Sequence, residues 1–284
     1  MGFQSAGLYL RRKPRGSPWL YNTERMISSL SAHTPYLWLV AASFIAGVMN
    51  AMAGGGSFIS FPAMLSIGVP PIEANATNTV ALWPGQLTSV LTLRRDLRRD
   101  LLAVVASASI LGGVSGAEVL LHTRPRTFMH LVPWLLLVAS LLFWISGPVS
   151  HWLKSRSSKP HAVRNPSVVP LFLTLLPICF YIGYFGAGAG FLLMSALAVY
   201  GVEEMNQLNS LKILGACLSN LCAVVTFIAG GAIVWHYCVI SMLFAAAGGY
   251  TGAQYARRMN PGILRAIVVV TGCAMSAYFF WRQP

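Results

Sequence analysis

The residues best suited to bind a ligand in this sequence are two groups of glycines inside apolar segments. Glycine has no Cβ, so the chain unwinds easily at such groups and frees backbone N–H groups, which inside a membrane need a protein or water partner. The two groups are Gly54, Gly55 and Gly56, and Gly186, Gly188 and Gly190. Each is predicted to break a helix, and Ser57 to cap a new helix that starts at Phe58. A helix amino terminus inside the protein attracts anions. The alternative is that the glycines only allow close helix packing.

Polar side chains follow each glycine group at similar distances. Besides the glycines, the candidates for substrate binding are Ser57, Asn75, Thr77, Thr79 and Gln86 in the first half, and Asn209, Ser210 and Lys212 in the second. Asn75, Thr79 and Gln86 share one helical face. Lys212 is the only lysine within an apolar span. An intramembrane cation is costly and indicates a functional site, although Lys212 could also extend to the nearer membrane interface.

Glu118 is the only acid within an apolar block, which makes it a candidate for proton coupling. It lies near the end of its span, so solvation at the membrane interface is the alternative. The five cysteines include no CxxC pair, which argues against a metal site or a disulfide framework. The chain has no HExxH, no GxSxG and no paired carboxylates. We therefore predict neither an enzyme nor a cofactor.

The composition is that of an integral membrane protein. Of the 284 residues, 56% are hydrophobic and only 10% are charged, and the mean hydropathy is +0.63. A soluble domain carries about 25% charged residues. The net charge of +13 comes from basic residues between the apolar blocks, a pattern that sets membrane topology and does not indicate nucleic-acid binding.

The chain repeats itself. GGVSGA at 112–117 returns as GGYTGA at 248–253, and AGGGSF at 53–58 is matched by GAGAGF at 186–191. We predict an all-α polytopic membrane protein of two four-helix repeats. The first repeat has spans at about 36–67, 72–93, 101–122 and 127–147, and the second at about 168–201, 206–230, 236–256 and 262–281. A basic cytoplasmic extension, 1–35, precedes the first repeat, 36–147. A cytoplasmic linker, 148–167, precedes the second, 168–284.

The first span of each repeat is too long for one straight crossing. Residues 36–67 would form a helix of about 48 Å, against an apolar core of about 30 Å. The span is either a broken helix that crosses the membrane or a hairpin that turns back at the glycines. Eight crossings place fourteen basic residues on the side of the amino terminus and four on the other, whereas hairpins give eight and ten. The positive-inside rule favours eight crossings, parallel repeats and cytoplasmic termini.

The glycine-rich segment 46–68, the ATN at 76–78, GAGAGF and the doubled GGxxGA resemble the TauE/SafE family of sulfite and sulfonate exporters. The resemblance covers about 36–281. It implies a carrier of small sulfur-containing anions in a bacterial inner membrane, with the glycines and Thr77 in the repeated family motif. The second half has Asn209–Ser210–Leu211 in place of Ala-Thr-Asn, so the two half-sites should differ.

We therefore predict a membrane transporter whose partners are a small anion, most simply sulfite or an organosulfonate, and the lipid bilayer. The alternatives are a transporter of another small solute and a membrane subunit that transports nothing. The sequence leaves the direction of transport, the coupling ion and the oligomeric state open.

Overall fold

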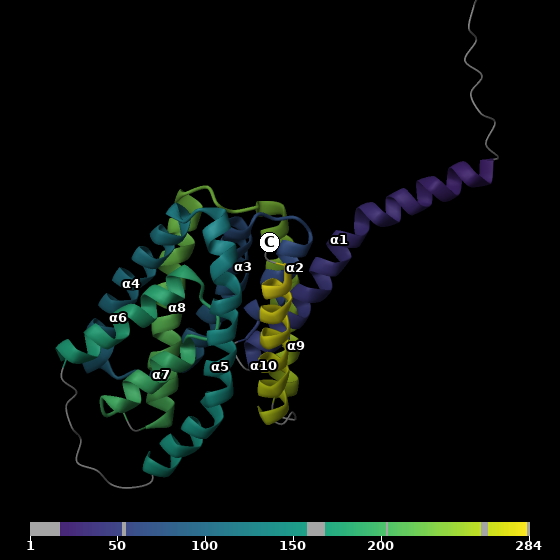
Figure 1. The fold of residues 1–284 in the computed structure, drawn as a ribbon. Coiled ribbons are helices and arrows are strands. Elements are labelled where there is room, and N and C mark those ends of the chain that lie inside the picture. The colour runs from purple at the N-terminus through teal and green to yellow at the C-terminus, as the bar shows by residue number, and fades with distance from the viewer. Residues whose placement is uncertain (1–17, 53–54, 158–167, 203, 257–260, 283–284) are drawn as a thin grey trace, which may run out of the picture. The chain divides into compact units, whose positions relative to one another are not determined.

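The computed structural model describes residues 18–52, 55–157, 168–202, 204–256 and 261–282, and every regular element in these ranges is a helix (Figure 1). The contacts divide the chain into two units, Met1–Leu37 and Trp38–Pro284, and the second unit contains everything discussed below. The α-helices are α1 (Pro18–Met52), α2 (Ser57–Ser66), α3 (Pro71–Leu93), α4 (Leu102–His122), α5 (Pro125–Ser157), α6 (Val168–Tyr184), α7 (Gly190–Val199), α8 (Met205–Ala229), α9 (Trp235–Ala256) and α10 (Pro261–Arg282).

Both long first spans are hairpins. The indole N–H of Trp38, early in the Trp38–Met52 part of α1, donates to Ser66 Oγ at the end of α2, over 3.0 Å. The hydroxyls of Thr174, early in α6, and Tyr200, just after α7, lie 2.9 Å apart. In each case the short helix runs back along the long one. We name these elements the first hairpin (Trp38–Ser66) and the second hairpin (Val168–Tyr200). The prediction that 36–67 and 168–201 each cross the membrane is therefore not confirmed.

Helices α3 and α8, which follow the two hairpins, are antiparallel. Ser210 Oγ, near the start of α8, donates to Asp96 O, just after α3, over 3.0 Å. The N–H of Val234, beyond the end of α8, donates to Thr77 Oγ1, near the start of α3, also over 3.0 Å. The bundle thus has two ends. The Ser66 end holds Ser66 and Val234, and the Asp96 end holds Asp96 and Tyr200.

Contacts with these elements show at which end of the bundle the other helices begin or finish. Leu121 at the end of α4 lies beside Gly230, so the turn between α4 and α5 is at the Ser66 end. Helix α10 returns to the same end, because Ser276 Oγ donates to Pro133 O in the early part of α5, over 2.7 Å. Helix α6 starts at the Asp96 end. The carboxyl-terminal end of α10 and the start of α6 therefore lie at opposite ends, and the predicted common side for the carboxyl terminus and the linker is wrong.

The predicted parallel relation of the two repeats does not agree with α3 and α8, the helices that follow the two hairpins, because these two helices run antiparallel. The charge count misled because it included the five basic residues of the first 25, which belong to the separate Met1–Leu37 unit. The predicted linker is partly helical, since α5 continues to Ser157. Its remainder, 158–167, lies outside the described residues.

In each half, the second helix after the hairpin packs on the hairpin of the other half. Helix α4 packs on α6, and α9 packs on the second part of α1. Glycines of the repeated motif make both crossings close. A Cβ at Gly116 would lie 2.1 Å from Phe180 O, and one at Gly248 would lie 2.0 Å from Phe44 O. This correspondence fits the internal repeat, which remains a prediction.

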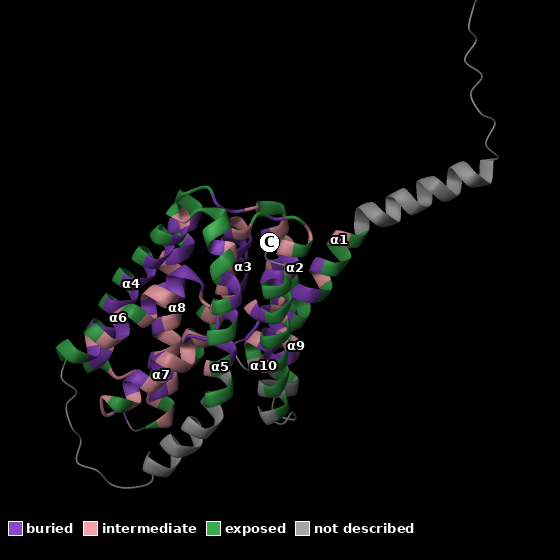
Figure 2. Cartoon of the chain, viewed as in Figure 1, coloured by how far each residue is buried: buried purple, intermediate pink, exposed green. Residues whose placement is uncertain are grey.

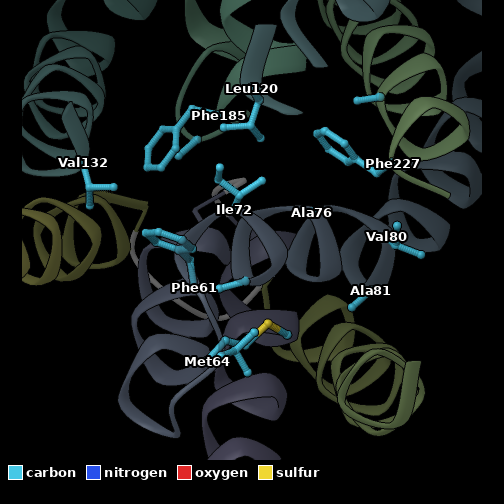
Figure 3. Packing of buried hydrophobic residues seen from close by; sticks show 14 of the residues in the cluster. Phe61, Met64, Ile72, Ala76, Val80, Ala81, Leu120, Val132, Phe185 and Phe227 are labelled. Atoms are coloured by element: carbon cyan, nitrogen blue, oxygen red, sulfur yellow. The ribbon is translucent and has the colours of Figure 1, made fainter. Parts of the chain in front are cut away.

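The core joins both hairpins. The ring of Phe61 in α2 packs edge-on against that of Phe185, just after α6, with centroids 5.7 Å apart, and both contact Phe128 of α5. Figure 3 shows Phe61 and Phe185 in one apolar cluster with Val132 and Leu120. Because a packed core tolerates little change of volume, this cluster fixes how far each hairpin enters the bundle.

The outer surface is apolar, as lipid contact requires. Exposed large side chains include Leu111, Trp144, Leu243 and Trp281, and Figure 2 shows exposed residues along the outer faces of α4, α5 and α9. Among the described helices, four stretches are long and apolar enough to cross a membrane: Thr34–Ala51, Arg99–His122, Pro125–Leu142 and Met205–Ala229. The chain is a multi-pass membrane protein, and the eight predicted crossings are not confirmed.

The inverted arrangement predicts a labelling pattern that parallel repeats do not. Single cysteines at Arg99 and Glu204 should react with an impermeant reagent from one side of the membrane. Cysteines at Arg124 and Trp235 should react from the other side. Parallel repeats instead separate Arg99 from Glu204, and Arg124 from Trp235. Reaction of the first pair from opposite sides, in a background without the native cysteines, would contradict the antiparallel halves.

Candidate functional site

The turn of the second hairpin, Phe185–Ala189, leaves a helix start inside the bundle. Gly186 and Gly188 both have φ of +76°, a conformation that glycine adopts without strain. The N–H groups of Phe185 and Gly186 are satisfied by Tyr181 O, and the Tyr181 hydroxyl donates to Ala187 O over 3.0 Å. These bonds fix the turn and direct the amino terminus of α7 away from the end of α6.

The first N–H groups of α7 have no acceptor among the described residues. Leu193 is the first whose N–H is bonded, to Ala189 O. The N–H groups of Gly190, Phe191 and Leu192 are the free donors that every helix start leaves, here placed inside a membrane protein. The helix dipole adds partial positive charge at the same point. This helix start is therefore suited to an anion.

Lys212 lies beside this helix start. A Cβ at Gly190 would be 3.8 Å from Lys212 Cδ and 3.9 Å from its Cγ, so the lysine stem passes alongside the first residue of α7. The side chain is half-buried. In the described part of the chain the ion pairs are Arg98 with Asp100 and His122 with Glu118, and neither involves Lys212. A cation without a counter-ion next to free N–H groups strengthens the case for an anion.

The turn of the first hairpin is built differently. Gly54 lies outside the described residues. A Cβ at Gly55 would be 2.9 Å from two carbons of Val268, and one at Gly56 would be 2.4 Å from Ala46 O. These two glycines serve close packing, which is the alternative that the sequence left open. Ser57 is the first residue of α2 and makes no capping bond, so its predicted role as a cap is wrong.

Three predicted polar ligands make contacts that hold helices together. Asn75 Nδ2 donates to Tyr184 O over 3.1 Å, which attaches α3 to the end of α6. Thr77 and Ser210 make the two contacts that join α3 and α8 to the opposite loops. Thr79 Oγ1 donates to Asn75 O within its own helix, over 2.9 Å. Asn75, Thr77 and Ser210 thus join helices around the site, and the role of all four residues in binding a substrate remains a prediction.

Gln86 lies where α3 crosses α8. Asn220 Nδ2 donates to Gln86 Oε1 over 2.9 Å, and the Asn220 side chain is 5% exposed. Asn220 Oδ1 would be 3.5 Å from a Cβ at Gly186, so it faces the turn of the second hairpin. Asn220 was absent from the predicted ligands, although it follows Lys212 by eight residues on the same helix.

The structure does not bring the other two candidates to this site. Asn209 is half-buried near the start of α8. Glu118 is exposed on α4, and its Oε2 lies 3.7 Å from His122 Nδ1 at the Ser66 end. This placement is that of an interfacial carboxylate, and its role in proton coupling remains a prediction. The described residues contain no group of three or more side chains that could hold a metal ion.

Comparisons with known proteins agree with this architecture. The sequence pattern of the family described as "Sulfite exporter TauE/SafE" matches residues 39–279. The chain belongs to the TauE/SafE family. The match covers all of the second structural unit except its two margins, so both hairpins, apart from Trp38, and the crossing of α3 and α8 lie within the matched residues.

Relatives are named only as transporters. A "Probable membrane transporter protein ORF9" of a Sinorhizobium species is 28% identical over 84% of this chain and 90% of its own length. A "Probable membrane transporter protein" of Haemophilus influenzae is 26% identical, over 86% and 94%. A third relative, the "Probable membrane transporter protein YfcA" of Escherichia coli K12, is 23% identical, over 84% and 87%. No solved structure matches the chain.

Gly188 in the second turn and Gly190 at the start of α7 should differ in their tolerance to alanine. Gly188→Ala should lower the melting temperature, because a left-handed residue with a Cβ costs about 1–2 kcal/mol and the Cβ would lie 3.1 Å from that of Ala139. Gly190→Ala should leave it almost unchanged, because its Cβ would meet only the Lys212 stem at 3.8 Å. Thermal unfolding in detergent measures both. Equal loss of stability in the two variants would contradict the geometry.

Proposed function

We propose that this protein carries a small anion, sulfite or an organosulfonate, across the bacterial inner membrane. The observation that supports this most is the pairing of Lys212 with the free N–H groups at the start of α7. Anions bind where fixed donors and positive charge converge, and interrupted helices supply such ends inside transporters. No carboxylate faces Lys212 among the described residues, so its charge is available to a substrate.

The chemistry of the site favours a compact oxyanion. Three backbone donors and one ammonium group can meet several oxygens of one tetrahedral or pyramidal anion. The surroundings of the second turn, Leu193 and Ala139 among them, are apolar. A small organic tail on a sulfonate would be compatible with such walls. A cation is disfavoured, because Lys212 would repel it.

The orientation that we propose puts the Asp96 end in the cytoplasm. Among described residues of the second unit that flank membrane segments, this end has seven basic residues: Arg94, Arg95, Arg98, Arg99, Lys154, Arg156 and Arg265. The Ser66 end has three: Arg124, Arg126 and Arg282. The positive-inside rule favours the richer end. In this orientation the 148–167 linker is cytoplasmic and the carboxyl terminus is not.

The alternatives make different predictions for flux. The purified chain would be reconstituted in liposomes loaded with unlabelled sulfite, and uptake of radiolabelled sulfite would be followed with and without unlabelled thiosulfate, isethionate or acetate outside. An anion carrier of the proposed class exchanges sulfite and is inhibited by its sulfur-containing analogues. Exchange of another solute alone would show a different permease, and no flux of any solute would favour a subunit without transport.

Removing the charge of Lys212 should abolish most of this transport. Lys212→Gln should reduce sulfite exchange about tenfold or more, because a charge-assisted hydrogen bond is worth about 1.5–3 kcal/mol. Lys212→Arg should retain more, since it keeps the charge. Arg95→Gln, which removes a charge from an exposed residue at the Asp96 end, is the matched control and should exchange normally. Normal exchange by Lys212→Gln would show that the lysine only reaches toward the interface.

A further inference from the structure

Asn220 and Gln86 form a hydrogen-bonded amide pair between the two halves of the protein. Asn220 comes from α8 and Gln86 from α3, 134 residues apart in the chain. In the part of the chain that the structure describes, each amide makes only this side-chain hydrogen bond. Gln86 Nε2 and Asn220 Oδ1 are thus left over, one a donor and the other an acceptor.

The group left over on Asn220 faces the proposed site. Its Oδ1 is 3.5 Å from the Cβ position of Gly186, at the turn that leads into α7. The Asn220 residue as a whole is 5% exposed. Lys212 lies two helical turns earlier on α8, beside Gly190. The turn of the second hairpin therefore runs along α8 from Asn220 to Lys212.

An amide pair can reverse without losing its bond. If both amides turn by half a revolution, Gln86 Nε2 donates to Asn220 Oδ1, and Asn220 Nδ2 points at the turn. An oxyanion accepts hydrogen bonds and gives none, so it is repelled by Oδ1 and attracted by Nδ2. In the structure Oδ1 is the atom that faces the turn, and the reversed orientation would present Nδ2 to an anion.

We propose that Asn220 is a substrate-contacting residue that donates its amide N–H to the oxyanion, and that Gln86 competes with the anion for that donor. The proposal rests on the proposed function, because it assumes that the second turn binds an anion. It assigns opposite roles to two residues that share one bond. Asn220 contributes to affinity and selectivity for oxyanions, whereas Gln86 holds the amide when the site is empty.

The test uses two variants that break the same hydrogen bond. The full chain in detergent would be titrated with sulfite, and the rise in melting temperature would give an apparent affinity. Asn220→Leu should weaken sulfite binding about tenfold or more, since a donor to a charged group is lost. Gln86→Met should bind sulfite as well as the wild type or better, because Asn220 is released. Both variants should have a similar, lower melting temperature without sulfite.

A purely structural pair gives another result. If the bond only joins α3 to α8, the two variants lose sulfite binding to the same extent, and this outcome overturns the proposal. Weaker binding by Gln86→Met than by Asn220→Leu overturns it as well. Failure of the proposed function is separable, because the wild type would then show no stabilisation by sulfite, thiosulfate or isethionate.

Discussion

The structure depends on a requirement of the backbone: inside a membrane, each freed N–H or C=O group needs a partner. Two hairpins end inside the bundle, and each turn frees such groups. At the first turn the partners are local, because the N–H groups of Phe58 and Ile59 at the start of α2 donate to Gly55 O and Gly56 O. At the second turn the carbonyl of Ala187 accepts from Tyr181, but the first donors of α7 stay free. The unsatisfied end is the one that lies beside Lys212.

The two halves of the protein share a plan but differ in chemistry. In the first half Ser60 Oγ donates to Asn78 Oδ1, which ties α2 to α3 by a buried polar bond. At the matching places in the second half are Leu193 and Leu211, in one apolar cluster. Thr79 matches Lys212 and bonds only within its own helix. An anion would therefore meet one charged half-site, reached by a hairpin from the Asp96 end.

Much of the fold was predictable because apolar blocks and glycines are local signals. The predicted spans 72–93, 101–122, 206–230 and 236–256 agree with α3, α4, α8 and α9 within about two residues. The turning back of each first span at its glycines was not predictable. It depends on contacts between distant residues, such as Trp38 with Ser66, that no periodicity reveals. The charge count failed because a basic segment of a separate unit outweighed the loops.

The types of residue at the site were predictable from the sequence, but the role of each residue was less so. Lys212 and Gly190 lie together, as a cation near a broken helix suggested. Asn75, Thr77 and Ser210 are also buried and polar, but they bond to backbone across helices. Sequence alone cannot distinguish a residue that binds substrate from one that joins two helices by a hydrogen bond, since both are polar residues in an apolar span. Asn220 was not among the predicted ligands, because its contact with Gln86, 134 residues away, cannot be read from the sequence.

The position of a bound anion tests this account most directly. Selenite resembles sulfite in charge and shape, and selenium scatters X-rays anomalously, so a crystal of the full chain with selenite would locate it. The account predicts one anomalous peak inside the bundle, within contact of the N–H groups at Gly190–Leu192 and of Lys212. A peak at the first turn, beside Gly55 and Gly56, or anywhere remote from α7 and α8, would contradict it.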